Sequence, residues 1–244
     1  LCAVPVVLGF VLPLLVMAMP LAASDVALPW RSFMQWSLNS LQLSGFKDVL
    51  AVAIALMLGH GLRARGGVLL QGVARLAGVG YAVPGAVIVV GLLLPIGWLQ
   101  QWVPNLRPGY WITATVLGLI WAYLVRFTAV AMQSVTSGYA RIPGSLDDTG
   151  RLLGLHGRHL FTRIHLPLMK RSIAAALLLV FVDVMKELPA TMVLRPFDSD
   201  TLAVVTYQLA RDERLAEASL PALALVLVGL IPVLLLSRTM RTRI

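Results

Sequence analysis

Charged residues are scarce in this chain. Asp, Glu, Lys and Arg make up 13% of its 244 residues, whereas an average soluble domain contains about 25%. Hydrophobic residues make up 59%, and the mean hydropathy is +0.85. Since a membrane-spanning helix needs roughly 20 mostly apolar residues, the length allows about six spans and little else. We predict a single all-α, polytopic membrane domain over residues 1–244.

Thiol, phosphate-binding and catalytic patterns are also missing. The single cysteine, Cys2, excludes an intrachain disulfide and a cysteine-rich metal site. No G-x-x-x-x-G-K-[ST] segment occurs, so ATP binding through the usual phosphate loop is not expected. No Ser/His/Asp or Cys/His arrangement indicates an enzyme. We therefore expect no enzymatic activity and no cofactor in this chain. The histidines are expected to be solvated loop residues and not metal ligands: His60, His156, His159 and His165.

Apolar runs define the expected spans. They lie near residues 1–22, 45–62, 79–99, 110–132, 171–190 and 215–236. The second run is short, and its helix could begin closer to Trp36. The run that opens at Leu1 has neither a basic leader nor a nearby A-x-A cleavage site, so we predict a transmembrane helix of a chain cut from a longer one.

The basic residues predict the orientation of these spans. Most of the 20 Lys and Arg residues fall between the second and third runs, in the segment 133–170 with Arg126 and Arg171 as its flanks, and at the C-terminus. Alternating spans place these regions on one side, which should be the cytoplasm, with both chain ends inside. The other side carries aromatic residues typical of a membrane interface: Trp30, Trp36, Trp98, Trp102, Tyr110 and Trp111.

Glycine and proline recur in the third run. Small residues let helices approach closely, and proline kinks can open a cavity between them. Both residues are common in any membrane helix, so ordinary packing is the favoured explanation and a role in a transport pathway the alternative. The residues are Gly78, Gly80, Pro84, Gly85 and Gly91.

The segment 133–170 predicts a short helix between two spans. Pro143 and Gly144 end the preceding helix, and Ser145 with Asp148 fits a capping box that starts a new one. Its apolar side would contain Leu146, Leu152, Leu153 and Leu155. Pro167 suits the first turn of the next span, where its missing N–H costs nothing. A rigid element joined to two spans can move them together.

This loop resembles the EAA motif of permeases in binding-protein-dependent ABC importers. The pattern is E-A-A, three residues, Gly, nine residues, Ile, one residue and Leu-Pro. The matching residues are Gly154, Ile164, Leu166 and Pro167, and the E-A-A positions fall on Asp148, Thr149 and Gly150. Asp148 keeps the carboxylate, but Thr149 and Gly150 are poorer helix formers than alanine.

The resemblance implies the type I importer permease fold, with the short helix as the coupling helix that docks on a cytoplasmic ATPase. It further implies a dimer of ATPase subunits that bind ATP and Mg²⁺, a periplasmic solute-binding protein, a second permease half, and the bacterial inner membrane. No nucleic acid partner is expected. The alternative is a basic amphipathic loop on anionic lipid headgroups, helped by Arg151, Arg158, Arg163, Lys170 and Arg171.

The fifth run carries charge inside the membrane. Asp183, Lys186 and Glu187 stand at i, i+3 and i+4, so they should share one helix face. Such residues usually face a bundle interior or a water-filled cavity. They are candidates for a translocation pathway, and an internal ion pair that fixes helix packing is an equally good explanation.

The residues that follow resemble the ferric-iron branch of these permeases, through KELPAT at 186–191, LRPF at 194–197 and DTLA at 200–203. Members of that branch commonly fuse two six-span halves, and this chain resembles the second half. Ferric iron is a hard cation that favours oxygen ligands, so Glu187 is the candidate to face the translocation path and to contact the metal. We expect Asp183 and Lys186 to set its charge. Asp198 and Asp200 are expected in a solvated outer turn.

The predicted function is therefore the permease of an ATP-driven importer that moves ferric iron by alternating access. An ABC permease for thiamine, a polyamine, a phosphonate or an inorganic anion is the first alternative. The second is an ion-coupled secondary transporter that uses Asp183, Lys186 and Glu187 as a relay.

Overall fold

The computed structural model describes residues 3–23, 29–64 and 66–241, and this part of the chain contains helices and no strand. The elements are α1 (Ala3–Val6), η1 (Val7–Val11), α2 (Leu12–Ala23), α3 (Trp30–Ala64), α4 (Val68–Val79), η2 (Gly80–Ala82), α5 (Gly85–Trp102), η3 (Pro104–Leu106), α6 (Pro108–Thr113), α7 (Val116–Tyr139), α8 (Gly144–Leu152), α9 (Gly157–Leu160), η4 (Phe161–His165), α10 (Leu166–Met185), α11 (Pro189–Leu194), α12 (Leu202–Arg211) and α13 (Leu215–Arg241). The predicted all-α class is confirmed.

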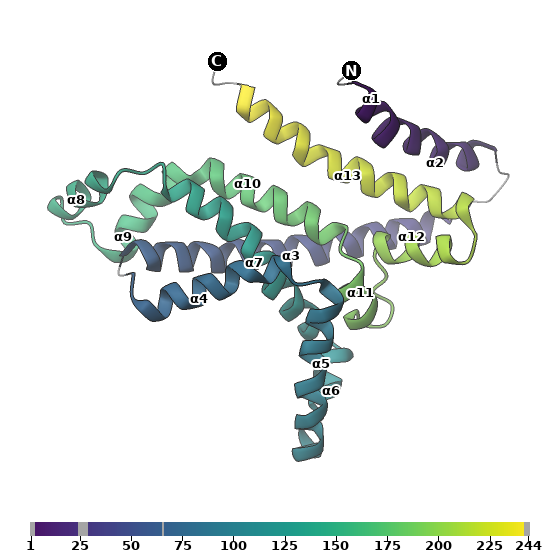
Figure 1. Cartoon of the computed structure of the whole chain (residues 1–244), viewed down its shortest axis with the longest axis horizontal. Coiled ribbons are helices and arrows are strands. Elements are labelled where there is room, and N and C mark those ends of the chain that lie inside the picture. The colour runs from purple at the N-terminus through teal and green to yellow at the C-terminus, as the bar shows by residue number, and fades with distance from the viewer. Residues whose placement is uncertain (1–2, 24–28, 65, 242–244) are drawn as a thin grey trace.

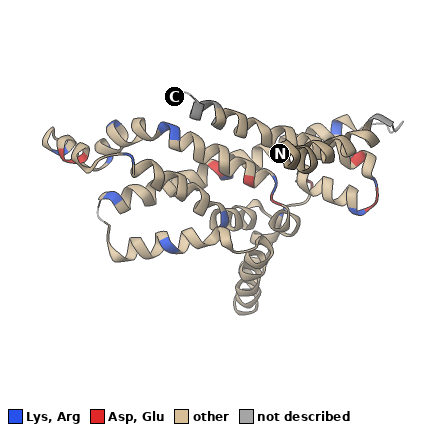
Figure 2. Ribbon diagram, turned by 45° about the horizontal axis from the view of Figure 1, so that its top comes forward, with Lys and Arg blue, Asp and Glu red and all other residues tan. Residues whose placement is uncertain are grey.

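Long helices lie side by side along the molecule (Figure 1). α3, α7 and α10 contact one another, and α13 packs on α10, α12 and α2. The short helix α8 lies at one end of this bundle, and α5 with α6 projects from its side. Charged residues are sparse along the long helices, and several gather at α8 (Figure 2).

Five helical segments in the described part are long and apolar enough to cross a membrane: Ala3–Leu21, Trp30–Ala64, Gly85–Trp102, Val116–Tyr139 and Leu215–Leu235. They correspond to the first, second, third, fourth and sixth predicted runs, with residues 1 and 2 outside the described part. α10 matches the fifth run and is 20 residues long. Its Lys170, Arg171 and Asp183 lower its apolar character.

Two helices begin or end far from the predicted boundaries. α3 already starts at Trp30 and runs for 35 residues, because the polar stretch before residue 45 packs against the rest of the chain and does not form a loop. Its Ser40 and Ser44 are buried. α7 continues to Tyr139, so residues 133–139, predicted as the start of the cytoplasmic loop, belong to the helix.

Proline interrupts two of the predicted spans. The third run does not start at residue 79, because Pro84 separates η2 from α5. The fifth run ends at Met185, residues 186–188 are not helical, and Pro189 opens the separate helix α11. Proline at the first position of a helix loses no hydrogen bond there. The predicted continuous helix over residues 171–190 is therefore wrong at its C-terminal end.

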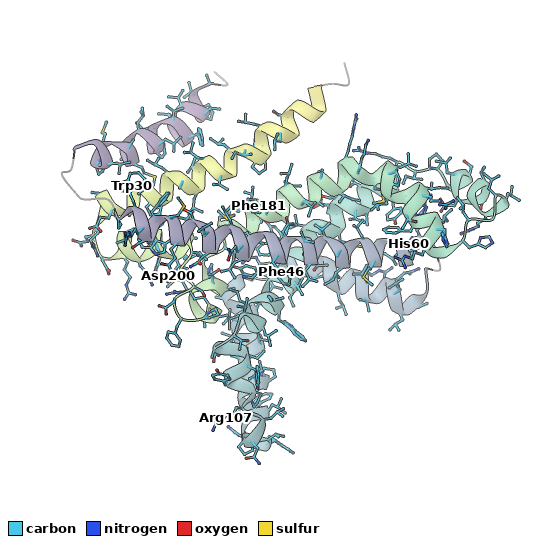
Figure 3. All side chains as sticks on the ribbon, turned by 180° about the vertical axis from the view of Figure 1, so that it is seen from behind. Trp30, Phe46, His60, Arg107, Phe181 and Asp200 are labelled. Carbon is cyan, nitrogen blue, oxygen red and sulfur yellow. The ribbon has the colours of Figure 1, made fainter. Side chains whose placement is uncertain are left out.

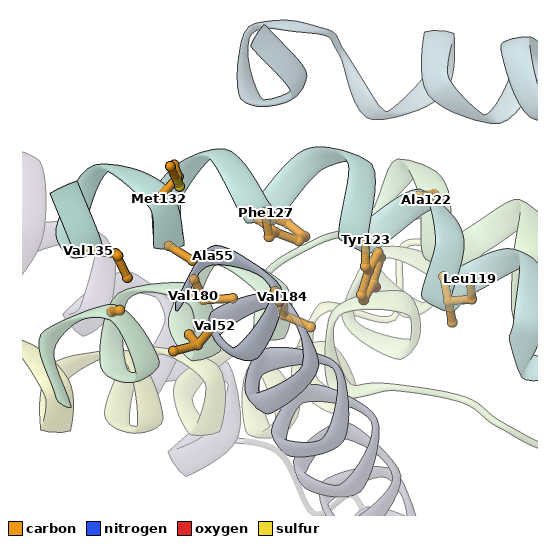
Figure 4. Close-up of a cluster of buried hydrophobic side chains, with 14 of the residues drawn as sticks. Val52, Ala55, Leu119, Ala122, Tyr123, Phe127, Met132, Val135, Val180 and Val184 are labelled. Carbon is orange, nitrogen blue, oxygen red and sulfur yellow. The ribbon is translucent and has the colours of Figure 1, made fainter. Parts of the chain in front are cut away.

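The core forms where α3, α7 and α10 meet (Figure 4). Small residues on α3 allow the approach, since Ala51 and Ala55 are 1% and 0% exposed. Larger side chains of the other two helices fill the space around them, among them Leu119, Phe127, Met132, Val135, Val180 and Val184. This core fixes the three helices around which the polar groups described next are arranged.

Candidate functional site

Two groups of charged residues join helices that are distant in the sequence. Arg126 and Glu187 form an ion pair inside the bundle, here named the central pair. Arg63, Asp147 and His165 form a second group at the end of the bundle near α8, here named the α8 clamp. Both groups are largely buried, so each fixes the helices that contribute to it.

The central pair closes the break between α10 and α11. Nη1 of Arg126 on α7 donates to Oε2 of Glu187 at 2.8 Å, and Glu187 is 5% exposed. Its other oxygen, Oε1, accepts the backbone N–H of Ala190 at 3.2 Å. This N–H lies in the first turn of α11, where the helix itself offers no acceptor. A buried carboxylate needs such partners, because an unpaired one is costly. The pair therefore stabilises the non-helical residues 186–188.

Neighbouring hydroxyls hold the same break. Thr191 donates its Oγ1 hydrogen to the carbonyl of Glu187 at 2.7 Å, and the Tyr123 hydroxyl of α7 is hydrogen-bonded to Thr191 Oγ1. Both side chains are buried. α7 thus contacts the break at two points, through Tyr123 and through Arg126.

Glycine allows α5 to reach the central pair. A Cβ atom on Gly85 would lie 2.5 Å from Arg126 Nη1 and 2.5 Å from Glu187 Oε1. A Cβ atom on Gly80 would lie 1.8 Å from the carbonyl oxygen of Val125. For these two glycines, close packing is the structural reason. At Gly78 and Gly91 a Cβ atom would meet no atom of the described residues within 4 Å.

The α8 clamp ties the end of α3 to the start of α8. Arg63 donates from Nε to Asp147 Oδ2 at 2.8 Å and from Nη2 to Asp147 Oδ1 at 3.1 Å. It also donates to the carbonyl of Tyr139, the last residue of α7, at 3.1 Å, and to that of Ile142, three residues further on, at 2.9 Å. Bidentate arginine–carboxylate contacts combine energy with fixed geometry. The hydrogen bond from Arg63 holds the pKa of Asp147 below its usual range, against the opposite effect of burial.

His165 adds the following helix to the clamp. Its Nε2 lies 3.0 Å from Asp147 Oδ1, and the ring is 1% exposed. It packs edge-on against Tyr139 with a centroid distance of 5.3 Å, and His60 of α3 lies 5.6 Å away. His60 lies at the α8 end of the molecule in Figure 3. The clamp therefore joins α3, α7, α8 and the helical run that leads into α10.

The C-terminus of α8 is closed by a glycine. Gly154 has φ +80°, its N–H donates to the carbonyl of Arg151 at 3.0 Å, and the Leu155 N–H donates to the carbonyl of Gly150 at 2.9 Å. These two bonds are the Schellman motif, in which glycine is favoured because φ is positive. The chain therefore turns sharply after α8.

Apolar side chains of α8 face outward. Leu152 is 88% exposed, Leu153 is 77% exposed and Leu146 is 39% exposed. We name these three the α8 leucine surface. A helix anchored by a buried ion pair, with leucines pointing away from the bundle, is suited to a partner that covers it.

The sequence of the chain is similar to those of known transport permeases. No family model matches the chain. Over 200 residues the chain is 30% identical to the Fe(3+)-transport system permease protein FbpB 2 of Haemophilus influenzae, covering 82% of this chain and 38% of that protein. Over 157 residues it is 26% identical to the putative 2-aminoethylphosphonate transport system permease protein PhnV of Salmonella typhimurium, covering 64% of this chain and 56% of that protein. The chain thus spans well under two thirds of the length of these relatives.

Solved structures share the fold. A chain of the crystal structure of a bacterial alginate ABC transporter, in complex with an alginate pentasaccharide-bound periplasmic protein, superposes with a TM-score of 0.70 at 16% identity, covering 97% of this chain and 90% of that one. A chain of the inward-facing MetNI methionine ABC transporter gives a TM-score of 0.64 at 14% identity, covering 89% and 99%. The chain belongs with the permeases of ABC importers.

In this permease the predicted trio of the fifth span does not share one face. Asp183 and Lys186 pair at 2.8 Å, and the Lys186 side chain is 65% exposed. Glu187 lies beyond the end of α10 and pairs with Arg126 instead. The prediction that the three residues share a helix face is therefore wrong, because Pro189 opens a new helix and α10 ends before Glu187. That Asp183 and Lys186 set the charge of Glu187 stays a prediction.

Asp183 does line a cavity, which lies between η2, α7 and α10 and has a volume of about 680 Å³. Its lining includes Tyr81, Gln133 and Thr136. Glu187 is not among its lining residues in the described part of the chain. The translocation roles of Asp183, Lys186 and Glu187 thus stay predictions. Glu187 was also the candidate iron contact, and both of its carboxylate oxygens already accept hydrogen bonds. Among the described residues, no group of three His, Cys, Asp or Glu is suited to hold a metal ion.

The prediction that Arg126 flanks the cytoplasmic loop is wrong. This arginine lies in the middle of α7, far from Tyr139 at the helix end. The sequence did contain a signal for its buried position: Arg126 is a single arginine inside the apolar run 110–132, and such a residue needs a partner inside the bundle. Lys47 and Asp48 of α3 lie inside the second predicted run, 45–62, and are buried at 1% and 4% exposure.

The predictions for the coupling segment are partly corrected. Ser145 makes no capping bond, because α8 starts at Gly144 with Pro143 at the N-cap position. The histidines divide. His156 and His159 are exposed, as expected, whereas His60 is half-buried on α3 and His165 is buried in the α8 clamp, so the prediction is wrong for these two. The acidic residue that anchors α8 is Asp147 and not its neighbour Asp148, whose side chain is 73% exposed.

The remaining motif residues lie on or beside α8. Thr149 is exposed and donates to the carbonyl of Ser145 at 2.9 Å. Gly150 is buried, and a Cβ atom there would lie 2.6 Å from Leu160 Cδ1 and 2.8 Å from Ile164 Cδ1. Leu166 and Pro167 open α10, as predicted for Pro167. Glycine at the third E-A-A position thus lets the run that leads into α10 pack directly on α8.

The predicted outer turn is tied to the bundle. Asp200 pairs with Arg195, and Asn39 of α3 donates to the carbonyl of Asp200 at 3.2 Å. Asp198 is exposed and has a φ of 58°. After this turn the chain forms α12, which packs on α13 and α3 and was not predicted. The solvated turn is therefore confirmed for Asp198, and Asp200 is partly exposed, at 35%, with Arg195 as its partner.

Replacing Gly154 by Ala tests the end of α8. Alanine at φ +80° costs about 1–2 kcal/mol, so we expect the Schellman bonds to loosen and α8 to exchange amide hydrogens faster. Gly144→Ala is the matched control, because a Cβ there meets nothing within 4 Å. Hydrogen exchange of the purified chain measures the difference. Equal protection of α8 in both variants would contradict the prediction.

Proposed function

We propose that the chain is the permease part of an ATP-driven importer that moves ferric iron into the cytoplasm by alternating access. The α8 leucine surface carries the proposal, since it is exposed on a helix that the α8 clamp ties rigidly to α3, α7 and α10. A partner that moves α8 would move these helices together, because they share a buried ion pair.

The proposed partners follow from this arrangement. A dimer of ATPase subunits binds ATP and Mg²⁺ and docks on α8 through Asp148, Thr149, Gly150, Gly154, Ile164, Leu166 and Pro167 with the leucine surface. A periplasmic binding protein delivers the solute on the other side, by analogy with the alginate ABC transporter, whose crystal structure contains an alginate pentasaccharide-bound periplasmic protein. A second permease half, the N-terminal part of the same polypeptide, completes the pathway. The chain itself hydrolyses no ATP.

This assembly lies in the bacterial inner membrane, with both ends of the segment on the cytoplasmic side. The proposal rests on the five apolar helices and on the excess of Lys and Arg near α8. Crosslinking α8 to a cytoplasmic ATPase in whole cells tests the orientation. Labelling of α8 by an impermeant reagent added outside the cell would refute it.

Ferric iron is the proposed cargo because the iron permease aligns with more of the chain and at higher identity than the phosphonate permease. A phosphonate is the second candidate, supported by the latter relative. Uptake of radioactive iron and of 2-aminoethylphosphonate by cells that produce the complete transporter separates the two. Uptake of the phosphonate without iron would replace the first proposal by the second.

Removing the α8 leucine surface tests the docking. We expect Leu152→Ser with Leu153→Ser to weaken association with the ATPase by about tenfold or more. The two leucines would be buried on docking, and the free energy of burying them exceeds the roughly 1.4 kcal/mol that a tenfold change in affinity requires. Co-purification and ATPase titration measure it. Leu106→Ser is the control, since Leu106 is 62% exposed. It lies on η3 next to Arg107, at the tip of the projection formed by α5 and α6 and far from α8 (Figure 3).

Both variants should keep the thermal stability of the parent chain, because the substituted side chains are exposed. ATPase binding that survives loss of the two leucines would contradict docking at α8. A gradient-driven flux from the chain without any ATPase would instead support the ion-coupled transporter.

A further inference from the structure

Lys47 of α3 is a buried cation that the proposed transport function leaves unexplained. The residue is 1% exposed, and its Nζ has no hydrogen-bond partner in the described part of the chain. A buried charge without a polar partner is unfavourable, so an apolar side chain would cost less at this position. Ionisable residues inside a membrane span usually serve a function. The contacts of Lys47 should therefore indicate what its charge does.

The ammonium group of Lys47 lies over the Tyr123 ring of α7. Nζ is 4.3 Å from the ring centroid, inside the range of about 6 Å over which the face of an aromatic ring attracts a cation. This attraction is strongest where water is excluded, and Tyr123 is 4% exposed. Asp48 does not compete for the ammonium group, because consecutive residues of a helix do not face each other. Lys47 therefore holds the Tyr123 ring against α3.

The Tyr123 hydroxyl extends this contact to the break between α10 and α11. Thr191 has a single hydroxyl hydrogen, and it donates this hydrogen to the carbonyl of Glu187 at 2.7 Å. The Tyr123 hydroxyl is therefore the donor in its hydrogen bond to Thr191 Oγ1. Hydrogen bonds in such a chain polarise one another. The chain of bonds thus leads from the ring that faces Lys47 to the backbone of the non-helical residues 186–188.

A small cavity places the same face of α3 beside the end of α10. Its lining includes Ser44 of α3, Tyr123 and Met185, and Met185 is the last residue of α10. Lys47 follows Ser44 by three residues, so both lie on one face of α3. This observation does not depend on the Lys47 ammonium group, and it shows that α3 meets Tyr123 next to the break.

α3 also carries Arg63 of the α8 clamp. Between Lys47 and Arg63 the helix is unbroken, and a rise of 1.5 Å per residue separates the two residues by about 24 Å along the axis. Arg63 contacts α8 through Asp147, whereas Lys47 contacts the tyrosine that supports the break. A rigid helix that is held at both points moves them together.

We propose that Lys47 is a positioning residue for transport, which ties α3 to Tyr123 and Thr191 and so makes the break at residues 186–188 follow the movement of α8. Lys47 acts through Tyr123 and not by binding the solute. The role in transport rests on the proposed function, whereas the effect on the break depends only on contacts within this chain. The two are therefore measured separately.

Hydrogen exchange of the purified chain in detergent tests the effect on the break. Lys47→Met should raise the exchange rate of the amides in residues 187–194 about tenfold, because the Tyr123 ring loses its cation. Lys47→Arg keeps a cation for the ring and should retain the protection. Tyr123→Phe keeps the ring and removes the hydroxyl, so it should raise the exchange rate to a similar extent. Lys47→Met combined with Tyr123→Phe should add little, since both act on one chain of contacts.

A general loss of stability is distinguished from this local effect. Lys47→Met removes a buried charge without a polar partner, so its thermal midpoint should equal or exceed that of the parent chain. Asp48→Asn is the matched control, because Asp48 is the next residue of α3 and is 4% exposed. It should leave the exchange of residues 187–194 unchanged. The proposal is overturned by unchanged exchange in Lys47→Met, by an equal rise in Asp48→Asn, or by faster exchange in all helices with a lower thermal midpoint.

Uptake into proteoliposomes with the ATPase and the binding protein tests the role in transport. Lys47→Met should move about tenfold less iron per ATP, while its affinity for the ATPase stays that of the parent chain. Normal uptake by Lys47→Met, together with faster exchange of residues 187–194, would overturn the role in transport. If the parent chain itself moved no iron, the proposed function would fail, and the exchange experiment would still decide whether Lys47 fixes the break.

Discussion

Glu187→Gln is expected to abolish most iron uptake by the assembled transporter and to destabilise the chain by about 3 kcal/mol, near the lower end of the cost of breaking a buried ion pair. The change leaves Arg126 without its counterion. Because the Arg126 side chain is 23% exposed, water compensates part of the loss. Thermal unfolding in detergent measures the stability, and uptake into proteoliposomes with ATPase and binding protein measures the transport.

The double variant Arg126→Met with Glu187→Met separates structure from function. Replacing a buried ion pair by apolar residues is often neutral or stabilising, so the double variant should regain most of the lost stability. We expect it to remain inactive in transport, because the charged groups near the break are gone.

Arg214→Met with Glu217→Met is the matched control. This pair lies at the start of α13 with Arg214 55% exposed, and exposed pairs contribute at most about 1 kcal/mol. Its loss should leave stability and uptake nearly unchanged. If the central double variant transported iron normally, the pair would be structural only, and Glu187 would lose its predicted role in the pathway.

Asp147→Asn is expected to uncouple ATP hydrolysis from transport, lowering solute moved per ATP by about tenfold, a loss that corresponds to about 1.4 kcal/mol. The amide cannot accept charge-assisted bonds from both Arg63 and His165, and bonds to charged groups contribute about 1.5–3 kcal/mol each. Arg63 would then lose its link to α8, and α8 could move without moving α3. Parallel measurement of ATP hydrolysis and uptake in proteoliposomes gives the ratio.

Asp212→Asn is the control for this experiment, because it removes the same charge from an exposed residue at the C-cap of α12, outside α8. Asp147→Glu should recover part of the coupling, since it keeps the carboxylate. Equal coupling in Asp147→Asn and Asp212→Asn would show that the α8 clamp does not transmit motion from the ATPase.

The sequence predicted well the features that depend on near neighbours along the chain. Runs of apolar residues placed the helices, because a helix in a bilayer must satisfy its backbone internally and present apolar side chains. Pro143 and Pro167 marked the start of α8 and the start of α10, since each acts on the backbone within a few residues. Boundaries failed where packing overrode local polarity, as in the polar first half of α3.

The partners of the charged residues could not be predicted, because they depend on contacts across the bundle. Arg126 and Glu187 are 61 residues apart in the sequence, and Arg63 and Asp147 are 84 residues apart. The sequence shows that a charged residue lies within an apolar segment, but it does not show which other helix packs against that residue. The three charges of the fifth span were grouped by helical spacing, and Pro189 removed the helix on which that grouping depended.

The sequence by itself determined that this protein is a helical membrane protein with a short helix between two spans, because composition and local backbone preferences fix both features. Only the tertiary structure decided which carboxylate anchors α8 and which cation pairs with Glu187. Those outcomes depend on how α3, α7 and α10 pack, which is set by the whole core and not by any single segment.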